Sequence, residues 1–270
     1  MNREEKIAAL NSAEKYGFED LVSIMELLRM PGGCPWDAEQ THESIRESLI
    51  EETYEVIEAI DNGDRALLRE ELGDVMLQVV FHARMEEEAG VFDINDVTDE
   101  ICRKLIHRHP HVFGNVSVDN SEQVLDNWEK IKSEEKKRET VTSKLRSIPK
   151  QLPALMRAEK VGKKAKCFDF KNTDAVVLKL EEEKSELLEA INIGDPDRIE
   201  EEVGDLLLTV TSLCRKLGVK SENALNRATD KFIERFEKLE NQVVKEGLDM
   251  ENLSMEQKDA IWDKNKAENQ

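Results

Sequence analysis

The sequence predicts an all-α protein built from two related helical halves. Its 270 residues include only 12 Gly and 6 Pro, with few β-branched runs, which disfavours a fold of many short strands. Apolar residues recur three or four positions apart along much of the chain, which is the period of an amphipathic helix. Five acidic residues of the first half also recur in the second half at one constant offset, so an internal repeat is expected.

The repeat sets the expected domain organisation. Its acidic members are Glu51, Glu52, Glu55, Glu71 and Asp74, followed by Glu182, Glu183, Glu186, Glu202 and Asp205. The differences 183 − 52 and 205 − 74 both equal 131, and the other three pairs have the same separation. Residues 132–153 are charged and contain two prolines, as linkers often do. The predicted parts are an N-terminal extension (1–17), a first domain (18–131), a linker (132–153) and a second domain (154–270).

The first half begins with helices that Gly and Pro separate. A short helix is expected within residues 1–17, and a second begins at Phe18 and carries apolar residues at helical spacing. The segment MPGGCPW, residues 30–36, ends that helix. Thr41 is then expected to cap a helix over about Ile45–Ile60.

An Asn-Gly-Asp turn at residues 62–64 separates this helix from the next one. The next helix has a predicted core stripe of Leu68, Leu72, Val75 and Val79. It should end at Glu88-Ala89-Gly90. Further helices are expected over Ile94–Arg108, which stops before a proline, and over Val124–Ile131.

The second half repeats this order. It starts with a basic helix over Leu155–Lys166, and Phe168-Asp169 stands where the first half has Trp36-Asp37. The paired acidic helices follow over residues 180–210, and another helix is expected over Ala224–Lys238. The repeat therefore covers most of both halves.

Composition excludes several classes of protein. The net charge of −20 disfavours general binding to nucleic-acid backbones, but a cation can still bridge carboxylates to a small phosphate ligand. No run approaches the roughly 18 apolar residues of a membrane helix, and the first residues lack the apolar core of a signal peptide. The four cysteines are widely spaced, as in reduced proteins. We expect a cytoplasmic protein that binds neither nucleic acid nor membranes.

The spacing of the acids favours a metal site. Positions three apart on a helix point to nearly the same side, and Glu52 with Glu55 is such a pair. Two facing helices of this kind would bring four carboxylates together, where like charges raise one another's pKa. A divalent cation relieves this repulsion, and hard oxygen ligands without His or Cys favour Mg²⁺ or Mn²⁺ over zinc.

A plainer alternative is that these glutamates form solvated helix faces, because single glutamates are mostly exposed. The glycines between a Glu and an Asp, Gly73 and Gly204, weaken that alternative. A glycine inside a helix costs about 1 kcal/mol, which a solvated face does not require. Close approach of a neighbouring backbone or a ligand would explain it.

The acidic motifs, which read EETYE…ELGD and EEKSE…EVGD, resemble those of the MazG family of nucleoside triphosphate pyrophosphohydrolases, of the tandem two-domain kind. CPWDAEQT, RHPHVF, LPALMRAEK and KFIERF are also similar to family segments. The resemblance implies two helical-bundle domains, a homodimer, Mg²⁺ as cofactor and hydrolysis of nucleoside triphosphates to monophosphate and pyrophosphate. It also implies a role in clearing surplus or non-canonical nucleotides.

The resemblance also implies roles for individual residues. The implied metal ligands are Glu183, Glu186, Glu202 and Asp205 in the second half, and Glu52, Glu55, Glu71 and Asp74 in the first. Glu182 and Glu51 are candidates to orient or deprotonate the attacking water. The implied nucleotide contacts fall within 179–183, 198–201 and 231–235 and at Trp262, and include Lys179, Arg198, Glu201, Lys231 and Arg235. Each cation could equally be a surface residue, and the tryptophan a core residue.

The two halves differ in cations. The first half has Ser48 and Leu67 where the second has Lys179 and Arg198. We therefore expect the second half to be the better triphosphatase, while the first is weaker, differently specific or structural. His107, His109 and His111 would be an alternative zinc site, but no further ligand accompanies them, which favours structural or surface roles.

Two other functions stay open at this point. The chain could be a nucleotide-binding regulator with low turnover, or a helical scaffold whose acids only confer solubility. Release of pyrophosphate from nucleoside triphosphates in the presence of Mg²⁺ would favour the enzyme, and binding without release would favour the regulator.

Overall fold

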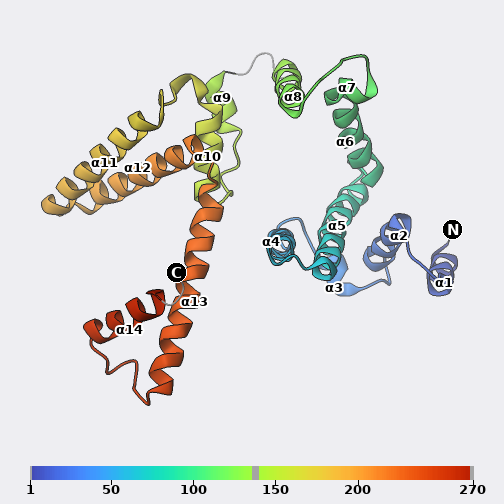
Figure 1. The fold of residues 1–270 in the computed structure, drawn as a ribbon. Helices are drawn as coiled ribbons and strands as arrows, with labels where there is room; N and C mark the ends of the chain where they lie inside the picture. Colours follow the sequence, from blue (N-terminus) through green and yellow to red (C-terminus); the bar gives the residue numbers. More distant parts are fainter. Residues whose placement is uncertain (1, 136–139, 268–270) are drawn as a thin grey trace. The chain divides into compact units, whose positions relative to one another are not determined.

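The computed structural model describes residues 2–135 and 140–267, which form helices, turns and no strand (Figure 1). The predicted all-α class is therefore confirmed. The chain divides into two compact units, which we call unit 1 (Met1–Glu135) and unit 2 (Lys136–Gln270). Every helix in the described ranges is too short or too polar to cross a bilayer. All four cysteines are free thiols.

Unit 1 contains a long helical hairpin and smaller helices around it. Its helices are α1 (Arg3–Ser12), α2 (Phe18–Arg29), α3 (Pro35–Glu39), α4 (Arg46–Asn62), α5 (Arg65–Glu88), α6 (Ile94–Arg108), α7 (Pro110–Phe113) and α8 (Ser121–Glu135). Helices α4 and α5 pack along each other, and α2 packs on α5. The hairpin turns at Gly63, whose φ of 67° is in the left-handed region that favours glycine. The carboxylate of Asp64 then accepts the N–H groups of Ala66 and Leu67 and starts α5.

Unit 2 is built on the same hairpin. It contains α9 (Val141–Arg146), α10 (Ala154–Lys164), a 3₁₀ turn (Lys166–Phe168), α11 (Thr173–Ile193), α12 (Pro196–Lys216), α13 (Ser221–Lys245) and α14 (Met255–Ala267). Helices α11 and α12 pack along each other, and α10 packs on α12. Gly194 has a φ of 75°, and the Asp195 carboxylate caps α12. These residues repeat Gly63 and Asp64 at the offset of 131, since 194 − 63 and 195 − 64 have that value.

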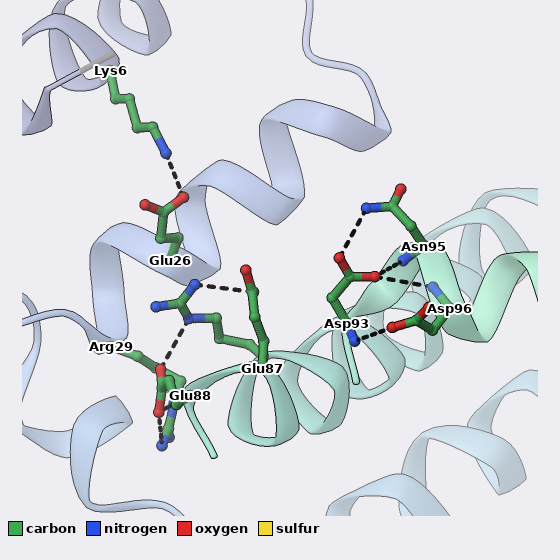
Figure 2. Close-up of polar contacts among 9 residues, drawn as sticks. Lys6, Glu26, Arg29, Glu87, Glu88, Asp93, Asn95 and Asp96 are labelled. Carbon is green, nitrogen blue, oxygen red and sulfur yellow. Dashed lines mark hydrogen bonds and ion pairs between the residues drawn. The ribbon is translucent and has the colours of Figure 1, made fainter. Parts of the chain in front are cut away.

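The core of unit 1 lies between α2 and α5. Its buried members are Met25, Ile45, Val80, Phe81 and Met85. Ion pairs hold the surrounding helices: the Arg29 guanidinium of α2 pairs with Glu88 of α5 at 3.0 Å, and Lys6 of α1 pairs with Glu26 of α2 (Figure 2). The C-terminal end of α5 is thus joined to α2 by an ion pair, and α5 also packs against α4.

Two local predictions were wrong. In the predicted core stripe of α5, Leu72 and Val79 are 49% and 41% exposed, because α2 covers a different side of the helix. Thr41 does not cap α4: its hydroxyl accepts the N–H of Ser44 in a separate turn, and α4 begins at Arg46 without a side-chain cap. Residues 30–36 do end the preceding helix, since α2 stops at Arg29, but the short helix α3 that contains Trp36 was not predicted. Proline at the first position of a helix is compatible with helix formation.

The segment predicted as a linker, residues 132–153, contains some regular structure. It includes the last residues of α8 and all of α9. Residues 136–139 lie outside the described part of the chain. The domain limits based on this segment stay predictions.

Candidate functional site

In unit 1, the hairpin brings three of the predicted acids together. Glu52 and Glu55 come from α4 and Glu71 from α5. One carboxylate oxygen of each lies within 4.8 Å of the others. The fourth predicted acid, Asp74, is one turn further along α5 and is outside this group of three. Facing helices therefore produce most of the convergence that the spacing predicts.

The charges in this unit 1 cluster are poorly compensated. Burial raises the pKa of Glu52, and the negative charges of Asp74 and Glu55 raise it further. Burial also raises the pKa of Glu71, with Glu55 and Asp74 contributing next. Asp74 is thus close enough to act on both carboxyls. These raised pKa values are those expected of like charges that lie close together, and a bound cation would reduce their repulsion.

In unit 2 the equivalent cluster forms between α11 and α12. Oxygens of Glu183, Glu186 and Glu202 lie within 4.8 Å of one another. Glu183 is only 5% exposed. Asp205 lines the same cavity as Glu183, although it is outside the group of three. The same three of four predicted acids thus converge in both units.

In contrast to the described part of unit 1, unit 2 supplies its own cations at the cluster. Lys179 Nζ lies 2.6 Å from Glu182 Oε1, 2.9 Å from Glu183 Oε1 and 4.0 Å from Glu186 Oε2. These contacts raise the pKa of Lys179 well above its usual value. Arg198 Nε is 3.7 Å from Glu202 Oε1. The ammonium of Lys179 therefore draws together carboxylates that a divalent cation could also bind.

Both clusters suit a hard divalent cation. Among the described residues, the two groups of three side chains that could hold an ion consist entirely of glutamates. Carboxylate oxygens on opposite helices are the ligands that Mg²⁺ and Mn²⁺ prefer. Burial raises the pKa of Glu186, and the charge of Glu202 adds to this, while Lys179 opposes it. A cation would thus replace repulsion by attraction in either unit.

The glycines beside the clusters have open surroundings. A Cβ built on Gly73 or Gly204 would have no neighbouring atom within 4 Å. The expected close approach of a neighbouring backbone is therefore not found among the described residues. A bound ligand stays the other explanation for a glycine at these positions.

The predicted nucleotide contacts divide into two sets. Lys179 and Arg198 lie at the unit 2 cluster, and Glu201 is an exposed residue of α12. Lys231 and Arg235 lie on α13, and Trp262 lies on α14, which packs on α13. The Trp262 ring contacts the Phe232 ring, with their centroids 5.3 Å apart. Figure 1 shows α14 beside α13 and apart from α11 and α12.

A cavity beside the unit 2 cluster was not predicted. Its volume is about 470 Å³, and its walls include Lys179, Glu183 and Asp205 as well as Phe168 and Arg215. Arg215 Nη1 and Lys216 Nζ donate to Asp169 Oδ2 at 2.8 and 2.9 Å, which holds the segment before α11 against α12. The hydrogen bonds from Arg215 lower the pKa of Asp169 far below its usual value. The only signal in the sequence was the correspondence of Phe168-Asp169 to Trp36-Asp37.

The histidines of unit 1 make contacts within the protein. His42 Nδ1 lies 2.7 Å from His82 Nδ1, and His42 Nε2 lies 2.8 Å from Glu86 Oε1. His109 Nδ1 lies 2.6 Å from the carbonyl oxygen of Leu105. None of the metal-binding groups found among the described residues contains a histidine. The structure therefore gives the zinc alternative no support.

Comparison with known proteins identifies the chain. The MazG nucleotide pyrophosphohydrolase domain family matches residues 40–113 and 171–239, which together are more than half of the sequence. The chain belongs to the MazG family. Each matched segment contains one complete acidic cluster.

Similar proteins align with nearly the whole chain. The nucleoside triphosphate pyrophosphohydrolase/pyrophosphatase MazG of Thermotoga maritima is 48% identical over 251 residues, or 92% of this chain and 95% of that protein. The nucleoside triphosphate pyrophosphohydrolase of Escherichia coli K12 is 45% identical, over 90% of this chain and 94% of that protein. The uncharacterized protein YabN of Bacillus subtilis is 40% identical over 92% of this chain, but over 51% of its own length.

Two aromatic residues of unit 2 lie outside the MazG domain match, one just before the acidic hairpin and one in the C-terminal helix α14. Lys231 and Arg235 are within the second matched segment, whereas Phe168 and Trp262 are outside it. Both acidic hairpins therefore lie inside the matched segments, whereas Phe168 and Trp262 lie outside them.

Proposed function

We propose that this MazG chain is a Mg²⁺-dependent nucleoside triphosphate pyrophosphohydrolase that converts a nucleoside triphosphate and water to a nucleoside monophosphate and pyrophosphate. The observation that carries the proposal is the convergence of three glutamate oxygens within 4.8 Å in each helical hairpin. Two relatives of nearly equal length have names that state this activity. Mg²⁺ is the first choice because the ligands are carboxylates, and Mn²⁺ is the second.

In unit 2, Glu183, Glu186 and Glu202 would hold the metal, with Asp205 completing the set. When bound, the metal would polarise a phosphoryl oxygen and make an attacking water more acidic. Glu182 would orient this water and accept its proton. The oxygen of the water bonds to the α-phosphorus, the bond from the α-phosphorus to the bridging oxygen breaks, and pyrophosphate leaves.

Lys179 and Arg198 would bind the triphosphate. Both carry hydrogen-bond donors at the edge of the cluster, where they offset charge on phosphate oxygens. Glu201, Lys231, Arg235 and Trp262 stay predicted nucleotide contacts. Because unit 1 has Ser48 and Leu67 in place of the two cations, we propose that unit 2 carries most of the turnover.

We also propose that the protein works as a cytoplasmic homodimer that removes surplus or non-canonical nucleotides. Support for a second copy comes from exposed apolar residues on the unit 2 hairpin, among them Leu178, Leu188 and Leu207. The net charge of −20 argues against nucleic acid as a partner.

The test is pyrophosphate release by the full chain from each common nucleoside triphosphate, with Mg²⁺, Mn²⁺ or a chelator. The proposal predicts release with either metal and none with the chelator. Metal-dependent binding without release would instead favour a nucleotide-binding regulator, and the absence of both would refute nucleotide chemistry altogether.

A further inference from the structure

The cavity in unit 2 is continuous with the acidic cluster. Lys179, Glu183 and Asp205 form the cluster side of its wall, and Phe168, Phe170 and Leu208 contribute apolar surface. Its volume of about 470 Å³ is in the range of sites for small organic ligands. A molecule that occupies it would therefore touch both apolar side chains and the residues proposed to bind metal and phosphate.

The repeat shows which residue keeps this cavity open. Ser212 lines it, and 212 − 131 is 81, so Phe81 is the equivalent residue of unit 1. The two helices keep the same register over this length: the buried residues Val80 and Thr211 are also 131 positions apart. Both helices start from the same glycine and aspartate turn. Ser212 and Phe81 thus occupy the same place on equivalent hairpins.

Phe81 fills the corresponding space in unit 1. It is 4% exposed and packs in the core with Met25 and Met85, under helix α2. The guanidinium of Arg29 lies 5.2 Å from its ring centroid. Ser212 has no ring, and in unit 2 its side chain lines the cavity instead of filling a core. The two hairpins therefore differ at this position, close to their acidic clusters.

Phe168 provides an aromatic face at the same cavity. It lines the cavity, yet its side chain is 94% exposed, so little of the ring is used in packing. The hydrogen bonds from Arg215 and Lys216 to the adjacent Asp169 hold its segment on α12. Planar nucleobases stack on such rings.

We infer that the cavity beside the unit 2 cluster binds the nucleoside part of the triphosphate, that Ser212 keeps the cavity open, and that Phe168 stacks on the base. This inference rests on the proposed function and deepens it. On this inference, Ser212 distinguishes the two units. Unit 2 can bind a nucleoside beside its acidic cluster, whereas in unit 1 the ring of Phe81 stands at the equivalent position.

The experiment compares two probes in the presence of Mg²⁺. One is a nucleoside triphosphate with a methylene bridge between the α- and β-phosphates, which resists cleavage, in versions with all four common bases. The other is inorganic triphosphate, which lacks a nucleoside. Calorimetry on the full chain measures the Kd of both for wild type, Ser212→Phe, Phe168→Ala and Ser185→Phe. Ser185 is an exposed residue of α11, so the last variant is the control for adding a phenyl ring to unit 2.

We expect wild type to bind the best methylene analogue more tightly than inorganic triphosphate. Ser212→Phe and Phe168→Ala should each weaken the analogue about fivefold or more, in line with the contribution of base stacking. Their affinity for inorganic triphosphate should stay within about twofold of wild type, and Ser185→Phe should affect neither probe. Retained binding of inorganic triphosphate also shows that Ser212→Phe has folded, and removal of the exposed Phe168 ring gives an independent variant.

Two results would overturn the inference. One is a wild-type protein that binds the analogues no more tightly than inorganic triphosphate. The other is an unchanged Kd of the analogue in both Ser212→Phe and Phe168→Ala. If wild type still releases pyrophosphate, either result refutes the nucleoside cavity alone, whereas absence of release from any nucleoside triphosphate refutes the proposed function.

Discussion

Replacing Glu183 by alanine tests the unit 2 cluster directly. Glu183 is the most buried acid of that cluster, and its oxygen is one of the three within 4.8 Å. Loss of one group that stabilises charge in a transition state typically costs about 100- to 1000-fold in kcat, or about 3–4 kcal/mol. We therefore expect Glu183→Ala, and likewise Asp205→Ala, to reduce pyrophosphate release by at least about 100-fold if unit 2 dominates.

The same substitution should change folding stability little. Lys179 keeps its contact with Glu182 at 2.6 Å, so no cation loses its last partner. The lost ion pair involves a partly exposed lysine, and such pairs contribute about 0–1 kcal/mol. The unfolding free energy from urea titration should therefore change by about 1 kcal/mol or less, with an unchanged helical circular dichroism spectrum.

The matched control is Asp174→Ala. Asp174 is an exposed acidic residue of the same helix, and it belongs neither to the cluster nor to the implied nucleotide contacts. Its removal should leave pyrophosphate release within about twofold of wild type. The reasoning is refuted if Glu183→Ala, Asp205→Ala and the double variant all retain wild-type release while remaining folded.

Three further predictions concern unit 1 and the wall of the cavity. Glu52→Ala should reduce total pyrophosphate release less than Glu183→Ala, and the reverse order in a steady-state assay would assign the turnover to unit 1. The raised pKa of Glu71 means that its ionised form destabilises the metal-free fold, so stability falls as pH rises through that pKa. With a chelator present, Glu71→Gln should therefore raise the Tm above that of wild type, and by more at about pH 7 than at about pH 5. An equal rise at both pH values would contradict repulsion between Glu71 and its acidic neighbours. Asp169→Asn should lower the unfolding free energy by about 1–3 kcal/mol at neutral pH, because hydrogen bonds to a charged group are weakened. Because the pKa of Asp169 is lowered in the folded state, its contribution to the unfolding free energy is present above the usual value of 3.8 and is lost as pH falls through the folded-state pKa. Urea titrations should therefore show the difference in unfolding free energy between wild type and Asp169→Asn becoming smaller in strong acid.

Much of the fold could be predicted because local signals agreed with one another. The Asn-Gly-Asp turn places a left-handed glycine after α4 and a capping aspartate before α5, and both appear in the structure. The spacing of Glu52, Glu55 and Glu71 on this hairpin predicted their convergence. The short helix α3 was not predicted, because proline both ends and begins helices.

The wrong core stripe has a different cause. Leu72 and Val79 have helical spacing, but a period shows only that a helix has an apolar side. Helix α5 carries apolar residues on more than one side, and only the tertiary contact with α2 decides which side is buried. The cavity in unit 2 was missed for the same reason, because it depends on Ser212, Phe168 and the segment that Asp169 holds in place.

Lys179 gives the two repeats different relationships with their surroundings. In unit 2 the Lys179 ammonium offsets part of the glutamate charge even when no divalent ion is bound. Unit 1 has serine at the equivalent position, so its carboxylates lack this counter-ion. The two copies of the repeat therefore differ in how strongly their carboxylates repel one another in the metal-free protein.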